Sequence, residues 1–256
     1  MVDGLLLDMD GVLVLSFEPM PGAVDTLSWL KDRRIPFRIV TNTTTHTRAA
    51  LADTLRAGGF DVVADDIITA AVGTGAYLRA HHPEAQVLLL TDGDAQEDLE
   101  GVTIVEPGEP ADVVVLGGAG EDFTYANLNH AFGLLREGAS LVAMHRNLYW
   151  RTARGLELDA GAYVAGLEEA ADVTATICGK PAPAFFDSAL ALLGQPAERV
   201  AMVGDDIVND VLGAQACGLT GVLVRTGKFL PQDLTKGRPD HVLNSFAELP
   251  SLWEAR

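Results

Sequence analysis

Several residue types and patterns are scarce in this chain, and each scarcity excludes a class of protein. There are two cysteines, Cys178 and Cys217, and neither belongs to a C-x-x-C pair, so no disulfide framework or zinc cluster is expected. No stretch approaches the roughly 18 apolar residues that cross a bilayer. The N-terminal segment MVDGLLLDMDG lacks the basic start of a signal peptide. We therefore expect a cytoplasmic protein.

Positive charge is also scarce. The chain has 36 Asp and Glu against 18 Lys and Arg, a formal net charge of −18, and lysine occurs only at positions 31, 180, 228 and 236. This balance argues against a general partner such as nucleic acid or an anionic membrane, because both are negative. It is compatible with a small anionic substrate held in one locally positive pocket.

Apolar residues are abundant, and their pattern indicates the fold class. They make up 48% of the 256 residues, enough for a sizeable core, which excludes wholesale disorder. Short apolar runs alternate with helical patterns. Near-continuous apolar strands between helices predict an α/β fold with a parallel sheet covered on both faces. The strands are expected at 4–9, 37–42, 66–70, 199–204, 221–226 and 241–244.

The middle of the chain has its own succession of strands and helices. It runs from 71 to 172, about the length of a small domain, and no Pro/Ser-rich linker separates it from its flanks. We therefore expect a discontinuous core, 1–70 and 173–256, interrupted by an inserted α/β domain at 71–172. The G-T-G at 73–75 lacks the third glycine of a dinucleotide fingerprint and is expected to form a hinge or turn.

Two acidic motifs follow predicted strands. Asp8 and Asp10, in D-M-D-G-V, stand two residues apart where the first strand ends, so their side chains can converge at its carboxyl end, the edge where ligands bind in open parallel sheets. In V-G-D-D-I-V-N-D, Asp205, Asp206 and Asp210 follow another strand. Asp206 alone could be a helix N-cap. Carboxylates crowded at one edge repel unless a cation lies among them, and oxygen ligands suit Mg²⁺.

Two further segments carry polar residues before predicted helices. Lys180 lies between Gly179 and Pro181, whereas Thr41 closes the second strand and Asn42 begins the next loop. Hydroxyls and amides before a helix N-terminus can hold phosphate. Taken alone, Lys180 could be a surface lysine in a turn, and the Thr41–Asn42 segment could be a helix cap. The segment G-V-L-V-R-T-G-K at 221–228 is not a P-loop, because five residues separate its glycines and Phe229 replaces the required Ser or Thr.

In combination, D-x-D, Thr, Lys and G-D-D-x-x-x-D follow one another along the chain. This set resembles the four motifs of the haloacid dehalogenase superfamily, whose core is Rossmann-like and three-layered. The insertion between the Thr and Lys motifs resembles the large α/β cap, type C2a, of subfamily IIA. Within it, the chain is similar to the branch of NagD-like proteins and of the phospholysine phosphohistidine inorganic pyrophosphate phosphatase. The resemblance spans the whole chain.

The resemblance implies a Mg²⁺-dependent phosphatase for small phosphomonoesters. Asp8 would be the nucleophile that forms an aspartyl-phosphate, and Asp10 the general acid and base. Mg²⁺ would be held by Asp8, the backbone carbonyl of Asp10, and Asp205, with Asp206 and Asp210 as supporting or partial ligands. The phosphoryl oxygens would be held by Thr41 and Asn42. The Lys180 ammonium would neutralise charge between nucleophile and phosphate.

In the family, the cap selects the leaving group. The residues expected to face substrate from it are His145, Asn147 and Tyr149, which follow a predicted cap strand. Candidate substrates include pyridoxal phosphate, phosphoglycolate, nucleoside monophosphates, sugar phosphates and pyrophosphate. A homodimer formed through the cap is also expected from related proteins.

Two alternative functions use similar residues. A phospho-receiver module also combines acids, Thr and Lys on a doubly wound sheet, but is about half this length and carries its phosphorylated Asp on an internal strand. A dehalogenase of the same superfamily needs no Mg²⁺ and lacks the second Asp of D-x-D, so Asp10 speaks against it. A catalytically inactive binding protein is disfavoured because every matched position is occupied.

Overall fold

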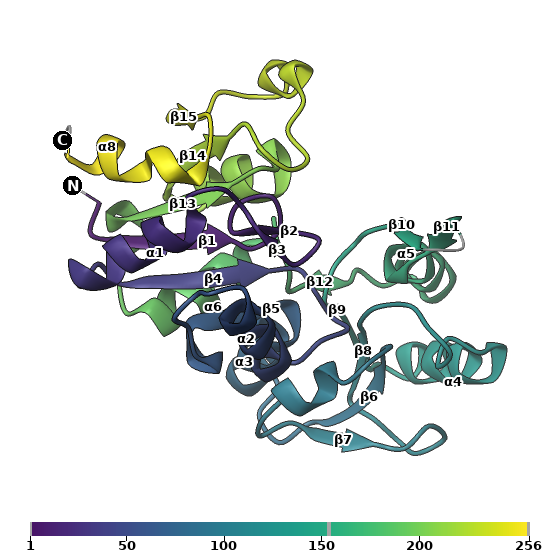
Figure 1. Cartoon of the computed structure of the whole chain (residues 1–256). Coiled ribbons are helices and arrows are strands. Elements are labelled where there is room, and N and C mark those ends of the chain that lie inside the picture. The colour runs from purple at the N-terminus through teal and green to yellow at the C-terminus, as the bar shows by residue number, and fades with distance from the viewer. Residues whose placement is uncertain (1, 153–154, 255–256) are drawn as a thin grey trace. The chain divides into compact units, whose positions relative to one another are not determined.

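The computed structural model describes residues 2–152 and 155–254, which divide into two compact units (Figure 1). Unit 1 consists of Met1–Thr41, Arg48–Ile68 and Lys180–Arg256. Unit 2 consists of Asn42–Thr47 and Thr69–Gly179. The segments of unit 1 are thus distant in sequence and meet around one sheet.

The sheet of unit 1 has six strands, and the pairs around β1 run parallel. Because parallel neighbours end at the same edge, the segments that follow β1, β4 and β13 come together there. The strands, in spatial order, are β15 (His241–Leu243), β14 (Thr220–Val224), β13 (Val200–Gly204), β1 (Gly4–Asp8), β4 (Phe37–Thr41) and β5 (Ile67–Thr69). After β1 comes a small hairpin of β2 (Val14–Leu15) and β3 (Glu18–Pro19).

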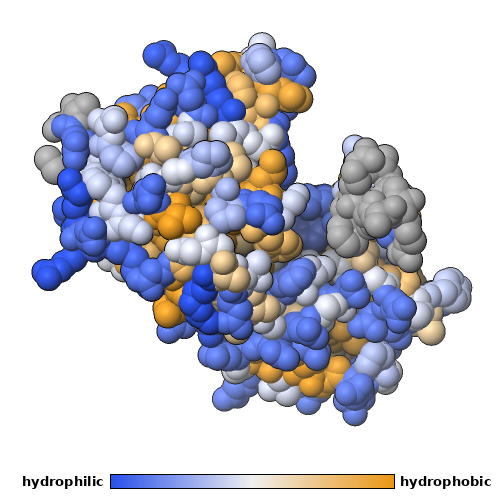
Figure 2. Space-filling view, in the orientation of Figure 1, coloured by the Kyte–Doolittle hydropathy of each residue, from blue (hydrophilic) through white to orange (hydrophobic). Residues whose placement is uncertain are grey.

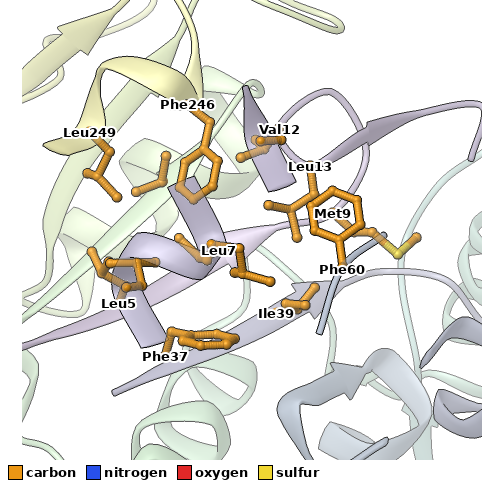
Figure 3. Packing of buried hydrophobic residues seen from close by; sticks show 14 of the residues in the cluster. Leu5, Leu7, Met9, Val12, Leu13, Phe37, Ile39, Phe60, Phe246 and Leu249 are labelled. Atoms are coloured by element: carbon orange, nitrogen blue, oxygen red, sulfur yellow. The ribbon is translucent and has the colours of Figure 1, made fainter. Parts of the chain in front are cut away.

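Helices cover both faces of this sheet, because both faces are apolar. Leu5 and Leu7 of β1 pack with Ile39 against α1, α2 and α8 (Figure 3). On the opposite face, Leu223 packs with Ile207 and Val211. Alternation of side chains along a strand produces this division. The helices are α1 (Ala23–Asp32), α2 (Arg48–Ala57), α6 (Pro183–Leu193), the π-helix η4 (Ile207–Leu212), α7 (Gly213–Ala216) and α8 (Leu249–Glu254), with short 3₁₀ turns η1 (Ala64–Asp66), η3 (Ala197–Arg199), η5 (Pro231–Thr235) and η6 (Phe246–Glu248).

Unit 2 is a second three-layer α/β structure with its own core. Leu88 and Val114 face α4 and α5, whereas Val87 and Val113 face α3. A separate antiparallel hairpin pairs β10 with β11. The elements are α3 (Ala70–His81), β6 (Gln86–Leu90), η2 (Ala95–Asp98), β7 (Thr103–Val105), β8 (Val113–Leu116), α4 (Tyr125–Arg136), β9 (Ser140–Ala143), β10 (Tyr149–Thr152), β11 (Gly155–Leu158), α5 (Ala160–Ala171) and β12 (Thr176–Ile177).

The expectation of a hinge or turn at 73–75 was wrong, because these residues lie inside α3. The side chain of Thr69 accepts a hydrogen bond from the backbone N–H of Val72, which starts the helix before the glycines. A Cβ built on Gly75 would lie 3.5 Å from Leu99 Cδ2. A small residue therefore fits this buried face of the helix, at a cost of about 1 kcal/mol in helix propensity.

The surface is largely hydrophilic (Figure 2), as expected for a chain with 36 Asp and Glu and 18 Lys and Arg. On the face shown in Figure 2, hydrophilic residues cover most of the surface and apolar residues form scattered patches. Among the described residues, none of the helices has the length and apolarity that a membrane crossing requires.

Candidate active site

The acidic motifs of unit 1 meet at the carboxyl ends of β1 and β13, because these strands are parallel neighbours with Leu7 opposite Val203. Asp8 is the last residue of β1, and Asp205 directly follows β13. Asp210 reaches the same place from η4, and a Cβ built on Gly204 would lie 2.3 Å from the Cβ of Asp210. Only a glycine at this position leaves room for the Asp210 side chain beside the strand.

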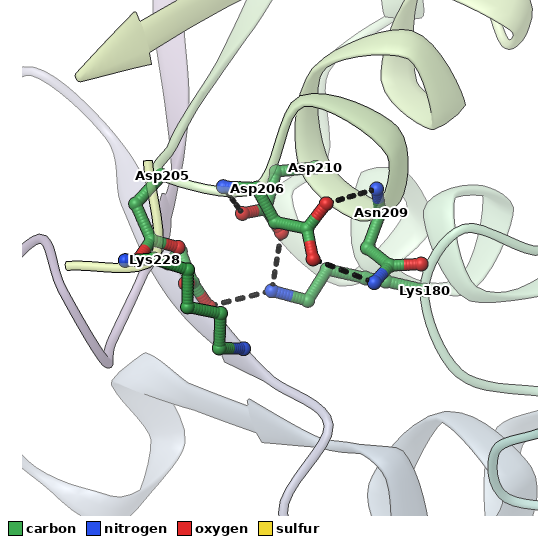
Figure 4. A network of polar contacts seen from close by, with 7 residues as sticks. Lys180, Asp205, Asp206, Asn209, Asp210 and Lys228 are labelled. Carbon is green, nitrogen blue, oxygen red and sulfur yellow. Dashed lines mark hydrogen bonds and ion pairs between the residues drawn. The ribbon is translucent and has the colours of Figure 1, made fainter. Parts of the chain in front are cut away.

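One buried ammonium group joins two of these acids. Lys180 Nζ lies 2.5 Å from Oδ1 of Asp8 and 2.7 Å from Oδ1 of Asp210 (Figure 4). All three side chains are buried. Since a buried charge is tolerated only when it is paired and hydrogen-bonded, the lysine is a structural counter-charge of the cluster as well as a candidate phosphate ligand.

Burial changes the proton affinity of each group. It raises the pKa of Asp8 and of Asp10, and the nearby lysine ammonium groups oppose part of this effect. Burial also raises the pKa of Asp205 and Asp210 to about 6. For Lys180, burial acts downward, but the carboxylates of Asp210 and Asp8 outweigh it and raise its pKa above the ordinary value. Each carboxyl group therefore holds its proton more tightly than an exposed one, whereas Lys180 is kept in its charged form.

The donor set fits a hard divalent cation. Asp8, Asp205 and Asp210 each offer a carboxylate oxygen, and these oxygens lie within 4.8 Å of one another. Oδ1 of Asp205 is buried without a hydrogen-bond partner among the described residues. An unpaired carboxylate oxygen in a buried site is costly, and a bound cation would remove that cost. All-oxygen ligands of this kind suit Mg²⁺.

Asp206 acts differently from its neighbours. Its Oδ1 accepts hydrogen bonds from the backbone N–H groups of Val208 and Asn209, each at 3.0 Å, and its Oδ2 accepts from the side-chain amide of Asn209. This is the N-cap of η4, the alternative that the sequence left open for one of these acids. The cap holds η4 in the orientation that presents Asp210.

Thr41 is the last residue of β4 and Asn42 follows it, and the two residues belong to different units. Thr41 is buried at the carboxyl end of β4 in unit 1, beside the end of β1. Asn42 belongs to unit 2, where its side chain approaches the backbone at Gly179, because a Cβ built there would lie 2.9 Å from Asn42 Oδ1.

The three cap residues expected to face substrate differ in exposure. His145 is buried in unit 2, with Nε2 3.7 Å from Oδ1 of Asp159 and Nδ1 accepting from the N–H of Asn147. Burial lowers the pKa of His145, and the Asp159 carboxylate opposes that effect. Asn147 and Tyr149 are exposed. Contact of these residues with substrate remains a prediction.

The segment 226–228 follows β14 and lies at the site, a place that was not predicted from the sequence. Its backbone lies against the turn after β1: Thr226 Oγ1 donates to the carbonyl of Gly11 at 2.5 Å, and the backbone N–H of Lys228 donates to Oδ2 of Asp205 at 2.6 Å. A Cβ on Gly227 would lie 2.6 Å from the Cα of Gly11. The available signal was its position after another strand of the same parallel sheet.

The chain matches known family models at both ends of its sequence. Residues 5–105 match the family described as haloacid dehalogenase-like hydrolase, and residues 177–249 match a model described as HAD-hydrolase-like. The chain is 38% identical over 235 residues to the human haloacid dehalogenase-like hydrolase domain-containing protein 2, which covers 92% of this chain and 88% of that protein. It is 39% identical over 238 residues to the phospholysine phosphohistidine inorganic pyrophosphate phosphatase of Danio rerio, covering 91% and 86%.

Solved structures agree over the whole fold. The p-nitrophenyl phosphatase from Archaeoglobus fulgidus has a TM-score of 0.89 at 27% identity, covering 98% of this chain and 99% of that one. NagD from E. coli K-12 has a TM-score of 0.87 at 26% identity, covering 97% and 98%. The chain is therefore a hydrolase of the haloacid dehalogenase-like family and belongs to its subfamily IIA.

Proposed function

We propose that the protein is a Mg²⁺-dependent phosphatase that hydrolyses a small phosphomonoester through an aspartyl-phosphate on Asp8. The observation that carries this proposal is the buried cluster in which Lys180 bridges Asp8 and Asp210 while Asp205 keeps an unpaired oxygen. Similar proteins named as p-nitrophenyl phosphatases and as a phospholysine phosphohistidine inorganic pyrophosphate phosphatase support the same class of reaction.

The chemistry divides between the two carboxylates of D-x-D. Asp8 attacks phosphorus and forms the Asp8–phosphoryl bond as the bond to the leaving oxygen breaks. Asp10 gives its proton to that oxygen, and burial, which raises the pKa of Asp10, favours the protonated form needed for this step. Asp10 then takes a proton from the water that attacks phosphorus. Inorganic phosphate leaves and Asp8 is regenerated.

The other residues of the site mainly compensate negative charge, because phosphoryl transfer spreads that charge over the phosphoryl oxygens. Lys180 provides this compensation from the side of Asp8. We assign Mg²⁺ to Asp8, Asp205 and the backbone carbonyl of Asp10, with Asp210 as a supporting ligand. When bound, this ion would neutralise the phosphoryl group and the crowded acids. Thr41 and Asn42 are assigned to the phosphoryl oxygens.

Unit 2 is proposed as the cap that selects the leaving group, with His145, Asn147 and Tyr149 as its substrate contacts. The substrate is a small phosphorylated metabolite in the cytoplasm, and we propose a homodimer formed through the cap. A screen of phosphorylated metabolites with Mg²⁺ would identify the substrate.

The test of the proposal is hydrolysis of p-nitrophenyl phosphate by the purified protein. We expect turnover with Mg²⁺, none with EDTA, and a loss of at least about a thousandfold in Asp8→Asn, because an amide is not a nucleophile of this kind. The matched control is Asp25→Asn, an exposed acid in α1 of the same unit, which should retain full activity. Full activity in Asp8→Asn, with an unchanged circular dichroism spectrum, would overturn the proposal.

A further inference from the structure

A second lysine, Lys228, lies at the acidic cluster, next to Asp205 (Figure 4). Three contacts fix its backbone: the Lys228 N–H on Asp205, the Thr226 hydroxyl on the carbonyl of Gly11, and the close approach of Gly227 to Gly11. The loop that carries Lys228 is thereby attached to the turn that follows β1, which carries Asp10 and comes directly after Asp8. Figure 4 shows the Lys228 side chain extending past the carboxylate of Asp205.

The two lysines of the site differ in what they contact. Lys180 is buried and bound to two carboxylates. Lys228 is exposed, and its ammonium has no ion pair or hydrogen bond with any residue that the structure describes. Its charge still acts on the cluster: burial raises the pKa of Asp10, and among the charges that oppose this rise Lys228 ranks ahead of Lys180. Lys228 is thus a cation near the general acid that remains available to a ligand.

The surroundings of Lys228 leave it as the available charge. It lines a cavity of about 160 Å³ together with Asp205, Asp206, Asp233 and Lys236. The carboxylate of Asp206 is used by the N-cap of η4. Asp233 pairs with Lys236 at 2.8 Å and accepts from the N–H of Leu230 at 2.7 Å. Asp205 is the ligand assigned to Mg²⁺, so the ammonium of Lys228 is the unpaired positive charge among these lining residues that an anion entering the cavity could bind.

We propose that Lys228 binds a second anionic group of the substrate, carried by the leaving group close to the scissile phosphorus, and so determines specificity. This inference rests on the proposed function, in which Asp10 marks the leaving-group side. It selects compounds in which a phosphoryl group is linked to another phosphate-like anion over esters of neutral alcohols. A point charge on a flexible stem suits this role, because it can follow the second anion without demanding one geometry.

The experiment compares two substrates in matched variants. Lys228→Met keeps the length of the side chain and removes its charge, and Lys228→Arg keeps the charge. In Lys228→Met we expect kcat/KM for inorganic pyrophosphate to fall about tenfold more than kcat/KM for p-nitrophenyl phosphate, the size of one charge-assisted contact. Lys228→Arg should recover most of the loss. Lys31→Met, at a half-buried lysine paired with Asp61, is the control and should change neither value.

A binding measurement makes the test independent of turnover. Methylenediphosphonate, an analogue of pyrophosphate whose P–C–P bridge is not hydrolysed, and orthophosphate are titrated calorimetrically into wild type and Lys228→Met in Mg²⁺ buffer. We expect the variant to lose about tenfold in affinity for methylenediphosphonate and less than about threefold for orthophosphate. Equal losses for both ligands, or no loss for either, would overturn the role of Lys228.

The two proposals fail in different ways. A wild-type protein that hydrolyses p-nitrophenyl phosphate, but neither hydrolyses pyrophosphate nor binds methylenediphosphonate more tightly than orthophosphate, contradicts the inference on Lys228 and leaves the phosphatase intact. A wild-type protein without Mg²⁺-dependent turnover of any phosphate compound contradicts the proposed function, and the calorimetric comparison still decides on Lys228.

Discussion

The ammonium of Lys180 lies 2.5 Å from Oδ1 of Asp8, and both groups are buried. This pair joins α6, which follows Lys180, to the end of β1, across 172 positions of sequence. The same ammonium holds Asp210 at 2.7 Å. Folding of unit 1 and assembly of the proposed site are therefore coupled through one charged group.

Removing that group should cost both stability and activity. In Lys180→Met, Asp8 and Asp210 lose their counter-charge, and breaking a buried ion pair in this way costs about 3–5 kcal/mol. We expect a lower free energy of unfolding in urea, together with loss of phosphatase activity. Adding Asp210→Asn to this variant should restore part of the stability but none of the activity. An unfolding free energy unchanged in Lys180→Met would contradict the assigned counter-charge role.

The turn at Gly11 should tolerate no side chain. Gly11 has a φ of +80°, and a Cβ there would lie 2.1 Å from Oδ2 of Asp205. Gly194 has a similar φ of +73°, but a Cβ built there would have no neighbouring atom within 4 Å. An alanine at Gly194 therefore measures the backbone strain alone, without the clash. Gly194→Ala should lose roughly 1–2 kcal/mol of stability and keep its activity.

Gly11→Ala should in addition lose about a hundredfold in kcat/KM, the effect of displacing a functional group by about 1 Å. Steady-state kinetics and a Mg²⁺ titration of both alanine variants check this. If Gly11→Ala retained the Mg²⁺ dependence and rate of Gly194→Ala, Asp205 would not hold the metal.

Stability of the metal-free protein should fall as the pH rises from about 4 to about 7. Burial raises the pKa of Asp205 and Asp210 from 3.8 to about 6, so between these values the folded state binds more protons than the unfolded state. Folding is then favoured at the acid end of the window, and this contribution is lost as the pH rises through 6. Each kcal/mol should appear as roughly 2–4 °C in the melting temperature.

Thermal melts in EDTA between pH 4.5 and 7.5 measure this dependence. Asp205→Asn removes one of the two groups and should flatten the slope. Excess Mg²⁺ should raise the melting temperature most at neutral pH, where the carboxylates are ionised and available as ligands. A metal-free melting temperature that increases from pH 5 to 7 would contradict the directions of these pKa shifts.

The sequence was informative where a residue's place depends on strand ends alone. Asp8, Asp205 and Thr41 each close or follow an apolar strand, and parallel pairing brings them to one edge. It was less informative where a local pattern has two uses. From the sequence alone, Asp206 could be either a metal ligand or a helix N-cap. The hydrogen bonds that its carboxylate accepts from Val208 and Asn209 identify it as the N-cap.

Other features depend on contacts between distant segments, which no local pattern contains. In the sequence, Lys228 belongs to a segment that resembles a P-loop but lacks its spacing. Its position beside Asp205 depends on the packing of Gly227 against Gly11, more than 200 residues earlier. The glycines at 73 and 75 indicate a turn by composition, yet they lie inside α3, whose first turn is capped by Thr69.

The most direct test of the account is mass spectrometry of the protein acid-quenched during turnover of p-nitrophenyl phosphate with Mg²⁺. Acid preserves an acyl phosphate, and peptide mapping locates it. The account predicts a phosphoryl group on Asp8, absent in the EDTA control and in Asp8→Asn. Phosphate release at the full rate with Asp8 unmodified, or a phosphoryl group on another residue, would contradict it.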